Sequence, residues 1–270
     1  MDYSDWVGNS VKSDDIITPR MVDHFKQTLG EHCFKLSDVP PGMHWCLAPG
    51  AVSPNALGPD GHPKLGSFLP EIPYARRMWA GGWLEFYDDF KIGDHVKRHS
   101  RIDDITFKSG KSGNLCFVAI THEFLVDGGL KLRERHDVVY REEVTPAPVL
   151  APIADSHAAH RWHVDTNTIM LFRYSALTFN GHRIHYDLPY STDIEGHGGL
   201  LVHGPLQATL MLNLACSVAG KLPEKMTYRG VRPLVCGDPI MIDADKEDGN
   251  LVACVRSADG NVTMKATVTL

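Results

Sequence analysis

The chain has 270 residues, and its content of 43% hydrophobic and 22% charged residues is that of a soluble globular protein with one large domain or two small ones. Its net charge of −6 disfavours a nucleic-acid surface, and it shows neither the roughly 20 apolar residues of a membrane span nor an apolar signal core behind its acidic N-terminus. The six cysteines form no C-x-x-C pair, which argues against a zinc ribbon or a disulfide framework, so we expect a cytoplasmic protein.

The first predicted elements are a short helix and a long irregular segment. Helix signals begin near Asp14 and Thr18-Pro19 and end at Gly30, with apolar residues at helical spacing between them. Residues 39–73 then hold too much proline and glycine for a long helix or a central strand, yet they are too apolar for a flexible linker. We expect an ordered loop that covers either a substrate tunnel or only a core, and the sequence leaves both open.

Four short runs that alternate or are wholly apolar follow this loop and predict an antiparallel sheet. The predicted strands cover residues 83–87, 95–105, 115–126 and 130–140. The run KSGKSG at 108–113 lacks phosphate-loop spacing and precedes no helix, so we interpret it as a hairpin turn. The run PAPVLAP at 146–152 can be neither strand nor helix and predicts a stiff linker.

The pattern of the first sheet returns after this linker. FKIGDHV at 90–96 recurs as LVCGDPI at 234–240, and each copy is followed by three strands with two turns. The strands of the second copy are predicted at 238–244, 250–257 and 261–269. The chain therefore reads as an internal duplication in which one helix and a curved antiparallel sheet are used twice.

The two copies differ in the stretch that holds candidate chemistry, residues 172–214. A helix capped at Asp165 is predicted to stop at Gly181, and a polar loop follows it. A second helix starts at Gly204-Pro205 and is apolar on every side, which predicts burial. Its first N–H groups and its positive end can hold an oxyanion, and His185 in the preceding loop can act as a general base.

These residues resemble the MaoC-like (R)-specific enoyl-CoA hydratases and 3-hydroxyacyl-thioester dehydratases. In that family the loop reads Asp-x-Asn-Pro-x-His and the central helix opens with His-Gly. Here Asn180, His182 and Arg183 replace Asp, Asn and Pro, whereas His185 matches the family's histidine. The spelling SALTFNGHRIHYD at 175–187 is similar to a branch with yeast-type mitochondrial thioester dehydratases and hydratases of itaconyl-CoA and mesaconyl-C4-CoA.

The resemblance implies an α+β double hot-dog fold. On this interpretation, residues 1–145 form a substrate-binding half without a catalytic loop, residues 146–160 a linker, and residues 161–270 the catalytic half. The first copy has only a broken stretch around Trp45 where the second has its buried helix.

The resemblance also assigns roles to residues around the loop. His185 carries both proton steps and Asn180, whose amide cannot accept a proton, orients water or the β-hydroxyl. The backbone N–H of Gly204 binds the thioester oxygen as enolate charge develops, and His203 and Tyr186 are further substrate-binding candidates.

Three arginines and three histidines have side chains that could bind a ligand. Arg76, Arg77 and Arg173 suit a substrate carboxylate or a coenzyme A phosphate, although a solvated surface role fits them equally. The histidines at 157, 160 and 163 have ligand-like types but no accompanying glutamate. We therefore expect no metal and no cofactor apart from the coenzyme A of the substrate.

The expected reaction is the reversible hydration of an enoyl-CoA to a 3-hydroxyacyl-CoA. A C5-dicarboxyl group such as itaconyl-CoA or mesaconyl-C4-CoA is preferred because the arginines can pair a second carboxylate, while a straight-chain fatty acyl thioester stays open. A thioesterase is disfavoured because Asn180 and Gln207 are amides, and a non-catalytic thioester-binding protein would explain the missing aspartate. The expected assembly is a homodimer.

Overall fold

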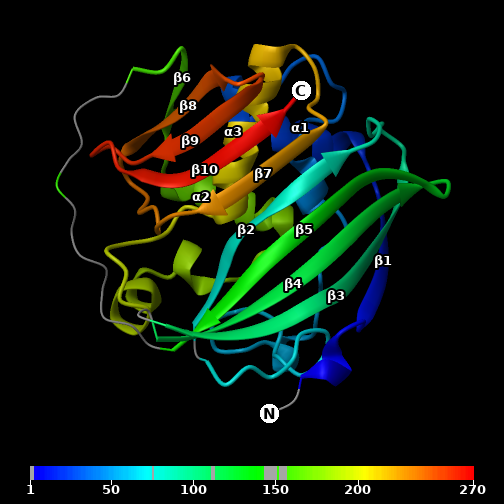
Figure 1. Ribbon diagram of the computed structural model, residues 1–270, viewed down its shortest axis with the longest axis vertical. Helices are drawn as coiled ribbons and strands as arrows, with labels where there is room; N and C mark the ends of the chain where they lie inside the picture. Colours follow the sequence, from blue (N-terminus) through cyan, green and yellow to red (C-terminus); the bar gives the residue numbers. More distant parts are fainter. Residues whose placement is uncertain (1–2, 75, 111–112, 143–150, 152–156) are drawn as a thin grey trace.

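The computed structural model describes residues 3–74, 76–110, 113–142, 151 and 157–270. They form one sheet of ten antiparallel strands (Figure 1) in the order β1-β3-β4-β5-β2-β7-β10-β9-β8-β6. The strands are β1 (Ser10–Ile16), β2 (Arg76–Phe86), β3 (His95–Gly110), β4 (Gly113–Val126), β5 (Gly129–Arg141), β6 (His160–Asp165), β7 (Lys225–Gly230), β8 (Pro239–Glu247), β9 (Asn250–Arg256) and β10 (Val262–Thr269).

The sheet consists of two five-stranded halves that join edge to edge. Strands β1 to β5 form one half and β6 to β10 the other, and β2 pairs with β7 across the junction. Gly81 allows this pairing, because a Cβ there would lie 2.6 Å from the carbonyl oxygen of Tyr228. The arrangement confirms the predicted α+β double hot-dog. The predicted linker at 146–160 lies mostly outside the described residues, so its boundaries stay a prediction.

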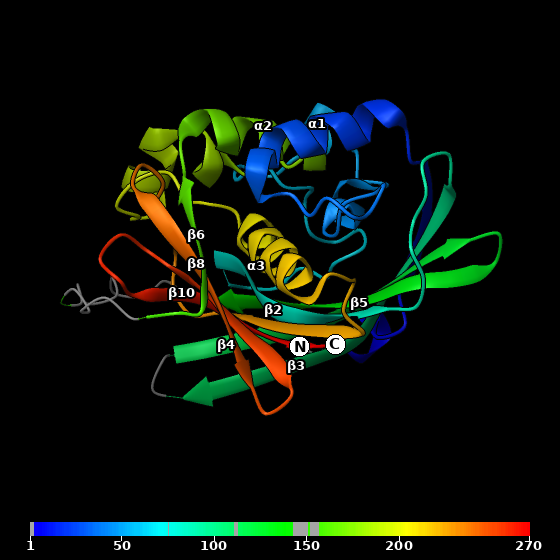
Figure 2. The same cartoon turned by 90° about the horizontal axis from the view of Figure 1, so that it is seen from above.

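Helix α3 (Gly204–Ala219) fills the concave face of the C-terminal half, as Figure 2 shows. Pro205 stands in its first turn, where a missing N–H costs nothing, and Gly220 ends it in the left-handed region at φ 71°. Every residue from Leu206 to Cys216 is buried, and each buried leucine contributes about 1.5–3 kcal/mol to stability. The prediction of a buried helix from Gly204 is confirmed.

Helices α1 (Pro19–Leu29) and α2 (Thr168–Thr178) form a layer beyond α3, on the side away from the sheet (Figure 2). The predicted start of α1 is correct, since the Thr18 side chain accepts from the backbone N–H of Met21 at 3.2 Å. The predicted cap of α2 is wrong. Asp165 is the last residue of β6, and the cap is Asn167, whose Oδ1 accepts from Met170 N at 3.0 Å.

Three strands were missed by the sequence patterns, namely β1, β6 and β7. Both β1 and β6 are edge strands of mixed polarity, so neither shows the alternation that marks a half-buried strand. The histidines at 160 and 163 belong to β6, where an odd spacing places them on opposite faces of the sheet.

The loop at 39–73 is ordered, as predicted, and serves both halves of the molecule. Met43 and Leu47 are fully buried in the main core, and Met43–Cys46 forms one 3-10 turn where the second copy has its helix. Further along, Ile72 packs with Val118 and other residues of a second, smaller core cluster.

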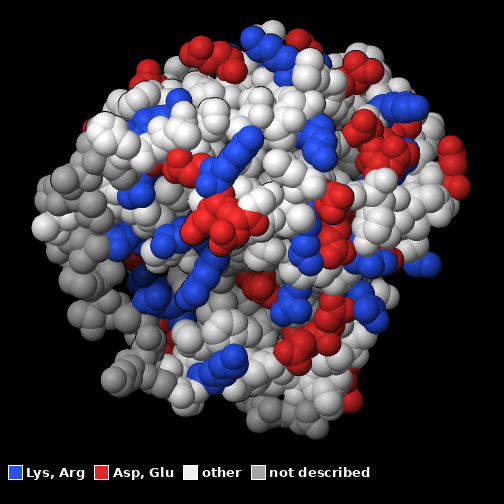
Figure 3. Space-filling model, turned by 45° about the horizontal axis from the view of Figure 1, so that its top comes forward, with Lys and Arg blue, Asp and Glu red and all other residues white. Residues whose placement is uncertain are grey.

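The surface of the molecule carries both signs of charge. On the face shown in Figure 3, acidic and basic side chains are interspersed. Within the described residues, no helix is long and apolar enough to cross a membrane.

Candidate active site

His185 lies in a one-turn 3-10 helix (Arg183–His185) and is buried, with 7% of its surface exposed. Its Nδ1 lies 2.8 Å from the carbonyl oxygen of Leu201. Because a carbonyl only accepts, Nδ1 donates and Nε2 keeps its lone pair. Burial lowers the pKa of His185 to about 4, so the imidazole is neutral at pH 7. The side chain is therefore in the form that a general base requires.

His203 holds the His185 ring in place at the start of α3. The two imidazoles stack, with ring centroids 3.6 Å apart and an angle of 18° between their planes. His203 is itself fully buried, and its Nε2 lies 2.8 Å from Oγ of Ser175 on α2. Its Nδ1 has no hydrogen-bond partner in the described part of the chain. The predicted base is thus fixed one residue away from the predicted oxyanion site.

The N-terminus of α3 is shaped by Gly204. A Cβ at this position would lie 2.7 Å from the ring of Trp79 on β2, so only glycine lets the helix start here against the indole. Among the described residues, the N–H groups of Gly204 and Leu206 have no acceptor. Such unpaired donors at a positive helix end suit an oxyanion.

Asn180 and Tyr186 brace the loop that carries His185. Oδ1 of Asn180 accepts from the backbone N–H of His182 at 3.0 Å, which orients the side chain and leaves its NH2 group and one lone pair of the oxygen for a ligand. The Tyr186 hydroxyl donates to the carbonyl oxygen of Gly181 at 3.0 Å, and 53% of this side chain is exposed. The structure therefore places Tyr186 on the outside of the loop, and its role in substrate binding stays a prediction.

Two of the three predicted arginines are held away from the His185 ring. Nη1 of Arg76 donates to the carbonyl oxygen of Glu195 at 2.6 Å and lies 3.8 Å from a carboxylate oxygen of the same residue. Arg173 is exposed, and its Nη1 donates to the carbonyl oxygen of Gln27 on α1 at 3.5 Å. Arg173 therefore lies at the surface between α1 and α2, and its role in substrate binding stays a prediction.

Arg77 is half-buried on β2, where it pairs in register with Tyr140 and stands two residues before Trp79. Burial is the largest cause that lowers the pKa of His62 and His182 and raises that of Tyr140, and the positive charge of Arg77 acts to lower all three. No carboxylate of the described residues forms an ion pair with Arg77. Its guanidinium is therefore a cation in the site without an acidic partner.

Sequence reasoning missed Asp60 and His62, which come from the long loop of the N-terminal half. Oδ2 of Asp60 lies 2.8 Å from Nδ1 of His62, and the His62 ring lies 4.2 Å from the ring of His182. One ligand atom from each of these three side chains falls within 4.8 Å of the others, a spacing that a divalent cation can bridge. No sequence signal pairs positions 60–62 with 180–183, because the contact joins segments about 120 residues apart.

Comparison with known proteins identifies the family of this chain. The family model of hydroxyacyl-thioester dehydratase type 2 matches residues 42–236. The chain belongs to this MaoC-like family. It is 38% identical over 236 residues to mesaconyl-C(4)-CoA hydratase of Chloroflexus aurantiacus, a match that covers 87% of this chain and 84% of that protein. It is 27% identical over 273 residues to the mitochondrial hydroxyacyl-thioester dehydratase type 2 of Schizosaccharomyces pombe, covering 88% and 90%.

Solved structures share the fold at low identity. A MaoC-like dehydratase from Phytophthora capsici superposes with a TM-score of 0.72 at 16% identity, covering 97% of this chain and 96% of that one. Rv0216 of Mycobacterium tuberculosis, described as a double hotdog fold, gives a TM-score of 0.58 at 13% identity over 97% and 95%. The family membership makes the protein a hydro-lyase and gives the His185 site a reaction class.

Proposed function

We propose that the protein catalyses the reversible hydration of a 2-enoyl-CoA to a 3-hydroxyacyl-CoA, and that the acyl group is a short dicarboxylate such as mesaconyl-C4-CoA or itaconyl-CoA. The observation that carries the reaction is the neutral His185, stacked on the residue that precedes the unpaired N–H groups of α3. A base and an anion-holding helix end are what addition of water to a conjugated thioester requires.

The reaction follows from the positions of these groups. In hydration, Nε2 of His185 takes a proton from water as the water oxygen bonds to C3. The C2=C3 electron pair then moves toward the thioester oxygen, where the N–H of Gly204 stabilises the negative charge. C2 finally takes a proton from the imidazolium, so the enzyme returns to its starting state. Coenzyme A arrives and leaves with the acyl group, and no further cofactor is needed.

Arg77 supports a dicarboxyl substrate. In a C5-dicarboxyl-CoA the second carboxylate lies only a few bonds from the double bond, so it must be accommodated beside the base. Burying it unpaired costs several kcal/mol, and a guanidinium offsets that cost. Arg77 acts electrostatically on His182, the neighbour of His185, and has no acidic partner among the described residues. The named relative at 38% identity hydrates a substrate of this class.

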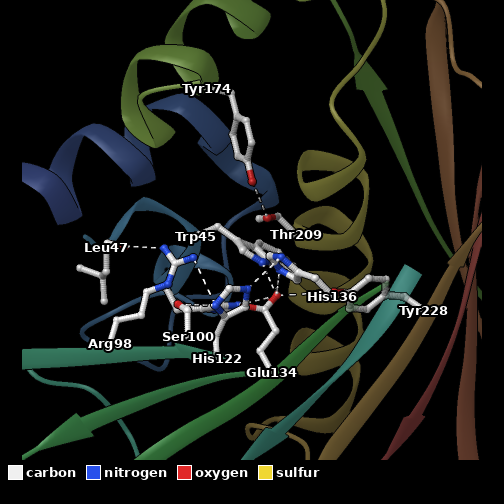
Figure 4. A network of polar contacts seen from close by, with 11 residues as sticks. Trp45, Leu47, Arg98, Ser100, His122, Glu134, His136, Tyr174, Thr209 and Tyr228 are labelled. Carbon is white, nitrogen blue, oxygen red and sulfur yellow. Dashed lines mark hydrogen bonds and ion pairs between the residues drawn. The ribbon is translucent and has the colours of Figure 1, made fainter. Parts of the chain in front are cut away.

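The concave face of the N-terminal half also favours a polar acyl group (Figure 4). Glu134 is buried there with 1% exposed, and its Oε1 accepts from Trp45 Nε1 and lies near His136 Nε2, both at 2.6 Å. The network continues through His122 to the guanidinium of Arg98. An alkyl chain placed here would have to displace buried charges and their hydrogen bonds.

Trp79 connects this polar network to the reaction site. Its ring packs against Gly204, on the side where a Cβ would point. It also packs edge to face with the His136 ring, with the ring centroids 5.6 Å apart. Its indole N–H is buried without a partner in the described part of the chain. An acyl group that extends from the α3 helix start toward the N-terminal half therefore meets a donor and then a polar wall, which suits a short polar group better than a fatty chain.

A thioesterase is the second candidate. The carboxylate of Asp60, which sequence reasoning missed, lies beside the loop that carries His185, but both of its oxygens bind His62. Glu195 accepts from the Tyr190 hydroxyl at 3.2 Å, and the Gln207 carbonyl accepts from Thr263 at 2.8 Å. No free nucleophilic carboxylate therefore faces α3 among the described residues, and hydration remains the better fit.

The test is an assay panel of mesaconyl-C4-CoA, itaconyl-CoA and crotonyl-CoA, followed by ultraviolet absorbance of the conjugated thioester and by mass spectrometry for free coenzyme A. We expect the dicarboxyl esters to be hydrated with the higher kcat/KM. Arg77→Gln should lower that value at least tenfold for the dicarboxyl esters and by less than threefold for crotonyl-CoA, because only the former bring a charge to Arg77.

The matched control is Arg20→Gln, which removes an exposed arginine at the start of α1 and should leave the turnover of all three substrates unchanged. Equal or better turnover of crotonyl-CoA by the wild type would contradict the dicarboxyl assignment. Release of free coenzyme A without hydration would instead identify a thioesterase.

A further inference from the structure

The N-terminal half contributes a loop segment, residues 58–62, to the site around His185. The backbone N–H of Arg183 donates to the carbonyl oxygen of Asp60 at 2.9 Å, and its Nη1 donates to that of Pro59 at the same distance. The backbones come closest at Gly61, where a Cβ would lie 1.9 Å from the carbonyl oxygen of Gly181. This contact fixes Asp60 and His62 relative to the loop that carries His185.

Asp60 uses both carboxylate oxygens on His62. Oδ1 accepts from the backbone N–H of His62 at 3.0 Å, and Oδ2 lies 2.8 Å from its Nδ1. Burial opposes ionisation of Asp60, but these bonds and the charge of His62 outweigh it and lower the pKa of the carboxyl. An ionised carboxylate only accepts, so Nδ1 of His62 carries a proton and Nε2 is the atom that can exchange one. Aspartate orients histidine in this way in the Ser-His-Asp triad.

A row of imidazoles leads from this pair to the base. The His62 ring lies 4.2 Å from His182, whose ring lies 5.6 Å from His185. Burial is the main cause that lowers the pKa of His182 to about 2 and of His185 to about 4, and the charge of His62 adds to both. Burial is also the largest cause acting on His62 and holds its pKa below the usual value, whereas Asp60 favours the protonated forms of His62 and His182. A proton on this row is therefore best stabilised at His62.

The reaction has a role for a second group that gives and takes a proton. Hydration and dehydration each need one proton taken and one given, and Asn180 cannot do either because an amide does not titrate. The Asn180 carbonyl moreover accepts from the backbone N–H of His182. No carboxylate is among the groups that act on the pKa of His185, so nothing acidic stabilises its imidazolium directly.

We propose that His62, oriented by Asp60, is a second catalytic acid–base residue of this active site. The assignment rests on the proposed hydration reaction and replaces its single-residue proton scheme: in hydration His62 takes the proton of water, and His185 gives a proton to C2. In dehydration, Nε2 of His185 takes the C2 proton, and the C–H electron pair forms the thioester enolate. That pair then forms C2=C3 while the C3–O bond breaks, and the leaving oxygen takes the proton from Nε2 of the His62 imidazolium and departs as water. Exchange with water then removes the proton from His185 and returns one to His62, which restores the enzyme.

Two variants that keep side-chain shape test this role in the dehydration direction, using the 3-hydroxy form of whichever thioester of the panel the wild type hydrates. His62→Gln should lower kcat at least about 100-fold, the contribution of a general acid. Asp60→Asn removes the charge that favours the His62 imidazolium, so its activity should also fall. Because dehydration needs this imidazolium, the alkaline limb of the kcat profile should shift to lower pH in Asp60→Asn.

A rescue experiment separates chemistry from structure. Asn180→Asp adds a carboxyl group to the same loop, and in the His62→Gln background it should restore activity at least tenfold. His24→Gln on the exposed face of α1 is the matched control and should behave as the wild type. Thermal melts within a few degrees of the wild type show that each variant is folded.

A substrate-free measurement distinguishes failure of this role from failure of the proposed function. NMR titration of the imidazole signals should show His62 as the Nδ1–H tautomer, with a pKa that falls in Asp60→Asn. An Nε2–H tautomer, a His62→Gln enzyme within threefold of wild-type kcat, or an unshifted alkaline limb in Asp60→Asn would each overturn the assignment. Stoichiometric zinc in the purified wild type, lost in His62→Gln and needed for activity, would overturn it in favour of a metal site.

Discussion

The reactivity of His185 is set by burial and by one carbonyl group. Burial keeps the imidazole neutral, and the Leu201 carbonyl selects the tautomer, so Nε2 is basic over the whole neutral range. Stacking on His203 removes the ring's rotational freedom. The residue is thus prepared for its role by its surroundings before substrate arrives.

The first prediction at the residue scale is that His185→Ala abolishes hydration and dehydration. With His185 removed, no other group beside the α3 start can take the C2 proton, so kcat should fall at least about 100-fold, as expected for loss of a general acid–base group. Initial rates on the enoyl and the 3-hydroxyacyl thioester measure it in both directions. His24→Ala, an exposed histidine on α1, is the control. Residual turnover above about one percent would remove His185 from this role.

The sequence identifies some of these residues and not others. His185 and Gly204 are predictable because each lies beside a local signal, a helix stop for the first and a glycine-proline helix start for the second. Asp60 and His62 are not, since their importance comes from a contact between backbones far apart in the chain. The exposed position of Arg173 was not predictable either, because a helical pattern does not show which of its faces meets another helix.

At the scale of elements, the loop at 39–73 joins the two halves around the site. The close approach of Gly61 and Gly181 lets Arg183 reach the carbonyl oxygens of Asp60 and Pro59. The glycine and proline content that excluded regular structure also makes this approach possible. The sequence therefore predicted an ordered loop correctly, but it could not predict which surface the loop meets.

A pair of glycine variants tests this contact. Gly61 and Gly93 both have positive φ, 89° and 97°, but a Cβ at Gly61 would lie 1.9 Å from the backbone of Gly181, whereas one at Gly93 would meet nothing within 4 Å. Either alanine should cost about 1 kcal/mol through backbone strain. Only Gly61→Ala should also separate the loops and lower kcat at least tenfold. Equal activities at matched melting temperatures would contradict the role of the contact.

The molecule as a whole is a duplication whose halves have diverged in their interiors. The C-terminal half fills its sheet with the apolar helix α3, whereas the N-terminal half holds a 3-10 turn and the network of Glu134, His136 and His122. The repeat of strands and turns was predictable because both copies keep it. The buried network was not, since its members lie on the two strands β4 and β5, and their spacing there looks like that of exposed polar positions.

Burial of neutral histidines couples the stability of the whole molecule to pH. Burial is the main cause of the lowered pKa in six of them: His62, His122, His182, His185, His197 and His203. An unfolded histidine binds a proton below a pKa of about 6.5, whereas folded His185 stays neutral until about pH 4. The unfolded chain therefore holds more protons between these values, so the free energy of unfolding falls as pH falls.

The last prediction is that the fall in the free energy of unfolding at low pH can be measured for individual histidines. For each such histidine, the free energy of unfolding should fall by about 1.4 kcal/mol per pH unit below the unfolded pKa, until the folded pKa is reached. His185→Gln keeps a donor for the Leu201 carbonyl but cannot titrate, so its stability should depend less on pH by about that amount between pH 6 and 5. Urea unfolding at pH 7, 6 and 5 measures the slopes, with exposed His24→Gln as the matched control. Parallel slopes for the wild type and His185→Gln would show that the folded His185 titrates like an unfolded one, and the neutral base on which the proposed reaction depends would be lost.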